Sequence, residues 1–316
     1  MEIDIRYLLF LQNIRLSTGG VLDEIFNSIS KIAVDLMIFM PYIIFWCVNA
    51  KMGYQAMSAL LSGEVLNGII KLTVCAYRPW IRSDQIEPAG DSKTAATGYS
   101  FPSGHTLVAT LTYGYIYLFQ KNKRKWLAVL CIILILLTGF SRNFLGVHTP
   151  QDVIVGLAEG VFVIWLVGVI RKKTEGKEKV LDWMTLGGIL LTIAALIYVV
   201  NKPYPMDYVD GKLLVNPQTM MNDMFKACGA FIGFCIGSYV ERHYLHFEVP
   251  VHAANLPMMG FVGFLIMFAW KEFLGPATVV AWFGGHWGNF ICRLLMILFA
   301  VILWPIIIKR ECKEQH

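Results

Sequence analysis

The chain has 316 residues, of which 56% are hydrophobic and only 16% are charged, and its formal net charge is +5. Soluble domains contain about 45 to 50% apolar residues. This composition, with a mean hydropathy of +0.57, therefore excludes an ordinary soluble domain and indicates a polytopic membrane protein.

The residue pattern within segment 1–31 predicts a helix that lies in the membrane interface. Apolar side chains recur there at helical spacing, at Val21, Leu22, Ile25, Phe26 and Ile29. Polar residues occupy the positions between them, as in an interfacial amphipathic helix. The alternative is a loop packed over the helix bundle. The stretch has no basic n-region, so it does not resemble a signal peptide.

Nine apolar runs follow, and a membrane span needs about 20 apolar residues. They cover residues 32–48, 52–74, 106–119, 126–140, 153–170, 181–200, 224–239, 258–270 and 289–308. Several are short, and we expect flanking polar residues or helix tilt to cover the difference. The sequence therefore predicts an all-α polytopic transmembrane bundle of about nine spans.

Basic residues gather in three short segments, 121–125, 171–179 and 309–313. Short loops rich in Lys and Arg stay in the cytoplasm. With nine spans all three clusters lie on one face, which places the carboxyl terminus inside and the amino terminus outside. Loops 75–105 and 141–152 then face the outside, the periplasm or a lumen, and we expect the cell (inner) membrane to hold the protein.

The seven cysteines lie mostly inside apolar runs and form no CxxC pair. Neither a zinc site nor a disulfide framework is indicated, and the cysteines are expected to be small buried hydrophobic residues. No internal repeat or long flexible linker interrupts the chain. A single integral membrane domain over residues 1–316 is the simplest interpretation.

The first of three polar blocks contains Lys71, Arg78 and Pro79. A spacing of seven residues is close to two helical turns, so Lys71 and Arg78 are expected on one helical face at the outer end of the second span. Pro79 then ends the helix or bends the chain. Both cations can reach one anion. Alternatively, they extend to the membrane interface, as Lys and Arg near span ends often do.

The second block, Pro102-Ser103-Gly104-His105, stands at the entry to the third span. A helix that begins here leaves backbone N–H groups of its first turn without intrahelical partners, which favours anion binding. Gly104 permits close backbone approach, Ser103 adds a hydroxyl donor, and His105 can exchange a proton with a bound group. The alternative is an ordinary helix start with an interfacial histidine.

The third block contains Ser141, Arg142, His148 and Asp152. Asp152 follows His148 by four residues, so its carboxylate can accept the Nδ1 proton and leave Nε2 free as a nucleophile. Arg142 can bind the same anion through two hydrogen bonds. The alternative is a chance ion pair in a loop.

Together the blocks match the Lys-x6-Arg-Pro, Pro-Ser-Gly-His and Ser-Arg-x5-His-x3-Asp signature of the type 2 phosphatidic acid phosphatase (PAP2) superfamily over residues 71–152. Members include lipid phosphate phosphatases, undecaprenyl pyrophosphate phosphatases, glucose-6-phosphatases and soluble vanadium haloperoxidases. The predicted span count is similar to that of the glucose-6-phosphatase branch. The resemblance implies a PAP2-like catalytic core at 32–171, after the interfacial segment 1–31, and additional transmembrane helices at 172–316.

The resemblance also implies roles that agree with the chemistry of the residues. Nε2 of His148 attacks phosphorus to give a phosphohistidine, Asp152 stabilises the imidazolium, and His105 protonates the leaving oxygen and then activates water. The equatorial oxygens are bound by Lys71, Arg78, Ser103, the Gly104 N–H and Arg142. Three cations replace a metal, so we expect neither a metal nor a cofactor.

The remaining polar residues give weaker indications. The outer loops near the blocks add only the carboxylates Asp84, Glu87 and Asp91, too few for a two-metal site. The histidines outside the blocks, at positions 243, 246, 252, 286 and 316, are expected to be structural or interfacial. Four further residues are expected either to support the site or substrate, or to be solvated or interfacial: Glu64, Asn67, Arg82 and Lys93.

The sequence thus predicts a membrane phosphatase that hydrolyses a lipid phosphate or polyprenyl pyrophosphate at the extracytoplasmic face. A sugar phosphatase, a phosphotransferase and, outside enzymes, a transporter or scaffold are the alternatives, whereas the membrane spans argue against a haloperoxidase. The expected partners are the phosphorylated lipid or sugar, membrane lipid and vanadate as an inhibitor. No nucleic-acid partner is expected.

Overall fold

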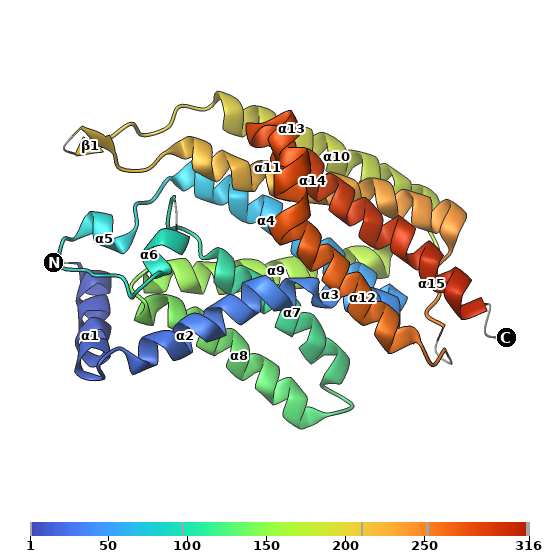
Figure 1. Cartoon of the computed structure of the whole chain (residues 1–316), viewed down its shortest axis with the longest axis horizontal. Helices are drawn as coiled ribbons and strands as arrows, with labels where there is room; N and C mark the ends of the chain where they lie inside the picture. The colour runs from blue at the N-terminus through green and yellow to red at the C-terminus, as the bar shows by residue number, and fades with distance from the viewer. Residues whose placement is uncertain (1, 97, 210, 251–252, 314–316) are drawn as a thin grey trace. The chain divides into compact units, whose positions relative to one another are not determined.

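The computed structural model describes residues 2–96, 98–209, 211–250 and 253–313. Helices dominate this part of the chain, as Figure 1 shows, and the predicted all-α fold is confirmed. The strands within it are β1 (Tyr208–Val209) and β2 (Lys212–Leu213), which form an antiparallel hairpin with Tyr208 opposite Leu213. The sequence did not predict this hairpin.

The chain divides into two compact units. Unit 1 comprises Met1–Ile38, Leu66–Ile164 and Asn201–Met221, and unit 2 comprises Phe39–Val65, Trp165–Val200 and Asn222–His316. Each unit contains segments from both sides of residue 171, so the division does not follow the predicted boundary between catalytic core and additional helices. A single membrane domain stays a prediction.

The helices fall into three groups by unit. Those within unit 1 are α1 (Ile3–Ser17), α2 (Val21–Lys31), η1 (Ile32–Leu36), α5 (Pro79–Arg82), α6 (Ser92–Ala95), α7 (Gly104–Gln120) and α8 (Lys125–Phe144). Those within unit 2 are α3 (Met40–Cys47), η3 (Glu241–Leu245), α12 (Leu256–Ala269), η4 (Trp270–Leu274), η5 (Pro276–Val280), α13 (Ala281–Phe283), α14 (Gly285–Leu298), η6 (Phe299–Leu303) and α15 (Trp304–Lys313). Those that contribute to both are η2 (Met37–Phe39), α4 (Ala50–Val74), α9 (Pro150–Thr174), α10 (Glu178–Asn201) and α11 (Pro217–Val240).

Seven helical segments of the described residues are long and apolar enough to cross a membrane. They are Val21–Cys47, Ala50–Arg82, Lys125–Phe144, Pro150–Thr174, Glu178–Asn201, Leu256–Phe283 and Gly285–Cys312. Two predicted spans are not among them. One lies in α7, which has 17 residues, and the other lies in α11, whose first half carries Asp223 and Lys226. The count of nine therefore stays a prediction.

The amphipathic stretch near the amino terminus is helical, as expected, but it does not end at residue 31. It continues through η1 and η2 into α3, so the first apolar segment begins at Val21. In unit 1, α2 packs on α8, with the Phe26 ring 4.5 Å from Phe144 and 5.4 Å from Phe140. The position of residues 1–31 in the membrane interface stays a prediction.

Glycines in α9 bring this helix close to α7 within unit 1. A Cβ added at Gly160 would lie 2.7 Å from the Thr110 side chain, and one added at Gly156 would lie 2.6 Å from the Ser103 carbonyl oxygen. Only hydrogen fits at these distances, because interiors are close-packed. Since Ser103 is the N-cap of α7, Gly156 fixes the distance between the amino-terminal ends of two helices.

Unit 2 contains a comparable close approach. The Trp46 indole donates a hydrogen bond of 2.8 Å to the Ala300 carbonyl, and its ring lies 6.2 Å from the ring of Trp304. A Cβ at Gly229 would lie 2.1 Å from the Phe290 carbonyl oxygen. Small residues at such crossings let backbones approach in membrane helix bundles.

Replacement of Gly156 by alanine is expected to destabilise the protein by about 1 to 3 kcal/mol, because the added methyl group overlaps the Ser103 carbonyl. Phosphate turnover should fall as well, since Ser103 is the N-cap of α7. Thermal unfolding in detergent measures the first effect. The matched control is Gly168→Ala in the same helix, which meets nothing within 4 Å. Equal behaviour of the two variants would contradict the packing argument.

Candidate active site

Contrary to the prediction from the sequence, Lys71 and Arg78 do not share one helical face, because the helix that contains Lys71 ends before Arg78. α4 ends at Val74, and Cys75 has φ +53°, a left-handed conformation that ends a helix. Arg78 is extended, with φ −65° and ψ 154°, because the residue before a proline is disfavoured in the helical region. Pro79 begins the short helix α5 and does not end α4.

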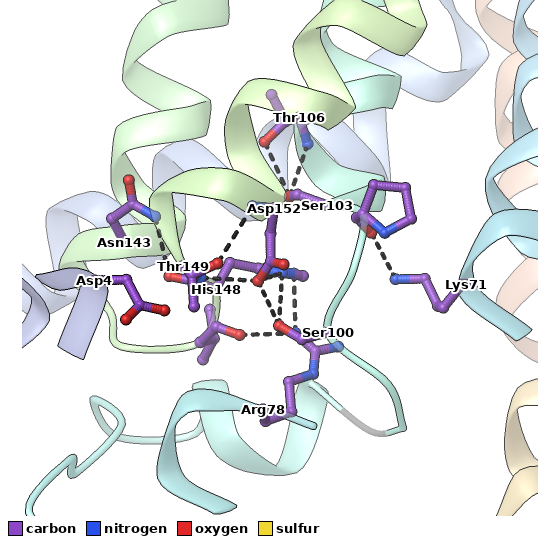
Figure 2. Close-up of polar contacts among 12 residues, drawn as sticks. Asp4, Lys71, Arg78, Ser100, Ser103, Thr106, Asn143, His148, Thr149 and Asp152 are labelled. Carbon is purple, nitrogen blue, oxygen red and sulfur yellow. Dashed lines mark hydrogen bonds and ion pairs between the residues drawn. The ribbon is translucent and has the colours of Figure 1, made fainter. Parts of the chain in front are cut away.

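Arg78 lies at the centre of the site and is only 5% exposed. Its Nη1 lies 2.9 Å from Nε2 of His148 (Figure 2). Nη1 also donates to the Val147 carbonyl at 2.9 Å, and Nε donates to the Gly98 carbonyl at 3.2 Å. A guanidinium has donors and no acceptor. Nε2 of His148 must therefore accept this hydrogen bond, which places the ring proton of neutral His148 on Nδ1.

The other ring nitrogen of His148 faces Asp152. Nδ1 lies 3.3 Å from Asp152 Oδ2, and the same oxygen accepts hydrogen bonds from Ser100 Oγ at 2.5 Å and from the Thr149 backbone N–H at 2.8 Å. Figure 2 shows these groups around one carboxylate oxygen. Asn143 Nδ2 donates to the His148 carbonyl at 3.0 Å. The imidazole is thus held from both sides.

Thr149 and Asp152 form a capping box at the beginning of α9. The Asp152 backbone N–H donates to Thr149 Oγ1 at 3.3 Å, and the Thr149 N–H donates to Asp152, with Pro150 at the first helical position. The Thr-Pro-x-Asp pattern of residues 149–152 is a sequence signal for this cap. Ser100 and Asn143 also contribute to the site, and nothing in the sequence marked them.

The Pro-Ser-Gly-His block begins α7, as the sequence indicated. Ser103 is the fully buried N-cap, and its Oγ accepts hydrogen bonds from Thr106 N at 3.4 Å and Thr106 Oγ1 at 2.9 Å. The Ser103 N–H donates to the Asp152 carbonyl at 3.0 Å, which joins α7 to α9. Lys71 Nζ donates to the Pro102 carbonyl at 2.9 Å. Three helix ends therefore meet here.

His105 and Arg142 complete the group of predicted residues. His105 interacts electrostatically with the cations Arg142, Arg78 and Lys71 and with His148. Arg142 is 3% exposed, and its Nη1 donates to Ser30 Oγ at 2.7 Å. Its Nε is buried without a hydrogen-bond partner in the described part of the protein. A buried cationic donor of this kind suits an anionic ligand.

Asn67 supports the site from within unit 1. Its Nδ2 donates to Glu159 Oε2 at 2.8 Å, and its Oδ1 would lie 3.5 Å from a Cβ at Gly104. Glu159 is 6% exposed, and its other oxygen has no hydrogen-bond partner among the described residues. The pair joins α4 to α9, one turn before Lys71. Glu64, which we expected beside Asn67, belongs to unit 2.

The other cations of the first loop are not in this cluster. Arg82 donates to Asp4 at 2.8 Å and also pairs with Glu2, so it binds the amino-terminal segment. Lys93 is exposed. A cavity of about 530 Å³ adjoins the site, and its lining includes Asp4, Val74, Arg82, Phe101, Thr149 and Asp152.

Histidines outside the blocks make contacts within unit 2. His243 Nε2 lies 3.0 Å from Asp182, and His286 Nδ1 lies 2.8 Å from Asn222 Oδ1. His246 follows η3 with a left-handed φ of +47°. His252 and His316 lie outside the described residues.

Residues 53–175 match the family model described as the PAP2 superfamily. The match includes all three blocks and confirms the resemblance inferred from the sequence.

The chain is also similar to curated proteins. It is 27% identical to a lipid phosphate phosphatase delta of Arabidopsis thaliana over 56% of this chain and 46% of the relative. It is 31% identical to an undecaprenyl-diphosphatase of Sulfolobus acidocaldarius over 42% of this chain and 61% of the relative. It is 35% identical to the undecaprenyl-diphosphatase BcrC of Bacillus subtilis over 34% of this chain and 51% of the relative.

The alignments thus span about half of the relatives' length. No solved structure gives a significant match. The apolar helices and these relatives show an integral membrane protein.

Burial, together with the charges of Arg78, Lys71 and Arg142, lowers the pKa of His148 well below 6.5. A histidine nucleophile must be neutral, so the role predicted for His148 implies that kcat/KM falls on the acid side only below pH 6.5. Lys71→Met removes one cation, so the pKa of His148 and the limb should move upward.

The test is the pH dependence of kcat/KM, corrected for ionisation of the substrate phosphate. Lys93→Met, at an exposed lysine of the first loop, is the matched control and should leave the limb in place. A wild-type limb at or above pH 6.5, or no shift in Lys71→Met, would show that these cations do not govern His148.

Glu159→Leu should destabilise the protein by about 1 to 3 kcal/mol, because Asn67 Nδ2 loses its acceptor in a buried position. Glu159→Gln keeps an acceptor oxygen and should remain closer to wild type in both unfolding temperature and kcat/KM. Both quantities can be measured on the same detergent-purified samples. Identical losses in the two variants would refute a hydrogen-bonding role for this pair.

Proposed function

We propose that the protein is a PAP2-type membrane phosphatase that hydrolyses a lipid phosphate or polyprenyl diphosphate through a phosphohistidine at His148. The observation that carries this proposal is the line of three side chains in which Arg78 donates to Nε2 of His148 and Nδ1 faces Asp152. Nε2 thereby keeps an unprotonated lone pair, and the Asp152 carboxylate orients the ring through Nδ1.

The first chemical step is attack of Nε2 on phosphorus. A phosphate oxygen accepts the hydrogen bond from Arg78 Nη1 in place of Nε2. The lone pair of Nε2 is then free to attack the phosphorus atom. The N–P bond forms as the bond from phosphorus to the leaving oxygen breaks, and Asp152 stabilises the imidazolium. His105 gives its proton to the leaving oxygen.

The second step releases phosphate. His105, now neutral, accepts a proton from water, and the water oxygen attacks the phosphorus atom of the phosphohistidine. The N–P bond breaks as the new P–O bond forms, which releases phosphate and restores neutral His148. The same histidine serves as acid and then as base, so the enzyme returns to its starting protonation state after one turnover.

Charge on the transferred phosphoryl group is stabilised by the cluster of cations and helix-end donors. Arg142 Nε, which is buried and lacks a partner in the described part, is suited to donate to an equatorial oxygen. The remaining proposed donors are Lys71, Arg78, Ser103 and the Gly104 N–H at the beginning of α7. Because three cations supply the positive charge, we propose a metal-independent reaction.

For the substrate, we favour an amphiphile over a free sugar phosphate. Relatives of the chain are named as phosphatases of lipid phosphates and of undecaprenyl diphosphate. The cavity beside Asp152 includes the apolar side chains Val74 and Phe101. The basic loops support a site on the extracytoplasmic face with the carboxyl terminus in the cytoplasm.

The test is phosphate release by the purified protein from undecaprenyl diphosphate, phosphatidate, lysophosphatidate and glucose 6-phosphate. We expect a lipid substrate to be preferred, vanadate to inhibit and EDTA to have no effect. His148→Ala should lower kcat by about 10⁴-fold or more, whereas the matched control His286→Ala, outside the cluster, should remain active.

Full activity of His148→Ala would refute the nucleophile assignment, and inactivation by EDTA would refute metal independence. Preference for glucose 6-phosphate would replace the lipid substrate with a sugar phosphate. Transfer of phosphate to an acceptor other than water would indicate a phosphotransferase.

A further inference from the structure

Segment 201–221 lies outside the residues that match the family model, yet it belongs to the same compact unit as the candidate site. It contains the end of α10, the β1–β2 hairpin and the first turn of α11. We propose that this segment positions the phosphate-binding cations Lys71 and Arg78. The proposal rests on the proposed function of the site.

The first contact stabilises the turn that ends α4. Lys202 Nζ donates to the Leu72 carbonyl at 2.6 Å and lies 3.5 Å from Cys75 Sγ. Carbonyls in the last turn of a helix lack intrahelical partners, and a cation is favourable at that end. Cys75 has φ +53°, a conformation that residues other than glycine rarely adopt. Lys202 therefore supports the turn that redirects the chain after Lys71.

The second contact holds the residue that precedes Arg78. The Tyr77 hydroxyl donates to Asp207 Oδ2. Asp207 lies next to the hairpin, and its carbonyl accepts a hydrogen bond of 2.9 Å from the Leu214 N–H, which fixes it to the other side of the hairpin. The position of Tyr77 is thus tied to segment 201–221 by a side-chain hydrogen bond to a charged acceptor.

The third contact holds a hydrogen-bond acceptor of Arg78. Gly98 packs against Met220, so that a Cβ at Gly98 would lie 2.2 Å from the Met220 Sδ atom. The carbonyl of the same glycine accepts the hydrogen bond from Arg78 Nε at 3.2 Å. Met220 therefore limits where this acceptor can lie.

The three contacts act on the backbone beside the cations. They hold the turn after Lys71, the residue before Arg78 and the carbonyl that orients its guanidinium. A loss of these contacts should weaken phosphate binding while the nucleophile remains in place. Lys202 and Asp207 are accordingly positioning residues.

The test compares Lys202→Met, Lys202→Arg and the matched control Lys212→Met, which changes an exposed lysine of the same segment 201–221. For the best phosphate substrate, Lys202→Met should raise KM about tenfold and weaken orthovanadate binding similarly, with a smaller change in kcat. Lys202→Arg should restore much of the loss, and Lys212→Met should equal wild type. Orthovanadate binding by calorimetry needs no turnover and reads the anion site directly.

A double-mutant cycle tests the second contact, with Tyr77→Phe, Asp207→Asn and the double variant. Vanadate affinities should be non-additive, because either single change already removes the charged hydrogen bond. Strict additivity in the cycle, or KM and vanadate affinity unchanged in Lys202→Met, would overturn the proposal. Altered unfolding temperature with unaltered vanadate affinity would also overturn it, since the role would then be structural alone.

These outcomes are distinct from failure of the proposed function. Wild-type protein that neither releases phosphate nor binds vanadate would contradict the phosphatase assignment and, with it, this inference. Active wild-type protein with unaffected variants would contradict this inference alone.

Discussion

The site depends on one hydrogen bond, from Arg78 Nη1 to Nε2 of His148. A guanidinium can only donate, so Nε2 accepts this hydrogen bond through its lone pair. The positive charge of Arg78 beside Nε2 disfavours protonation of that nitrogen. Burial acts in the same direction on the pKa of His148. In the proposed reaction, an incoming phosphate satisfies the same Arg78 donor and so replaces the contact that restrains His148. Binding of the substrate and activation of the proposed nucleophile would then be one event.

The ends of three helices surround the site, and they position its side chains and expose partially charged backbone groups. α4 ends at the turn after Val74, α7 begins at the Ser103 cap, and α9 begins at the Thr149 cap. Helix ends expose unpaired backbone groups, and in a largely apolar protein such groups need polar partners. Asp152 serves both the helix end and the histidine, because its Oδ2 accepts the Thr149 N–H at the beginning of α9 and lies 3.3 Å from Nδ1 of His148.

The sequence predicted the helical architecture, because apolar runs depend on local order along the chain. The structure brings the residues of the three blocks together, and their catalytic roles stay predictions. The sequence-based prediction was wrong where the conformation of a single residue set the direction of the chain. The left-handed turn at Cys75 ends α4 before Arg78, and cysteine carries no signal for such a turn. Ser100 and Glu159 were missed because their partners, Asp152 and Asn67, lie 52 and 92 residues away in sequence. Asn143 was missed because it is not a position of the motif, although its partner His148 is. The contribution proposed for segment 201–221 depends on tertiary contacts alone.

The most direct measurement is rapid-quench trapping of the phosphoryl-enzyme with substrate labelled in the transferred phosphate, followed by mapping of the label. The account predicts an acid-labile, base-stable phosphoramidate on His148 that forms before phosphate is released and that is absent from His148→Ala. Label on another residue, or single-turnover hydrolysis by active enzyme with no labelled protein at any time, would contradict it.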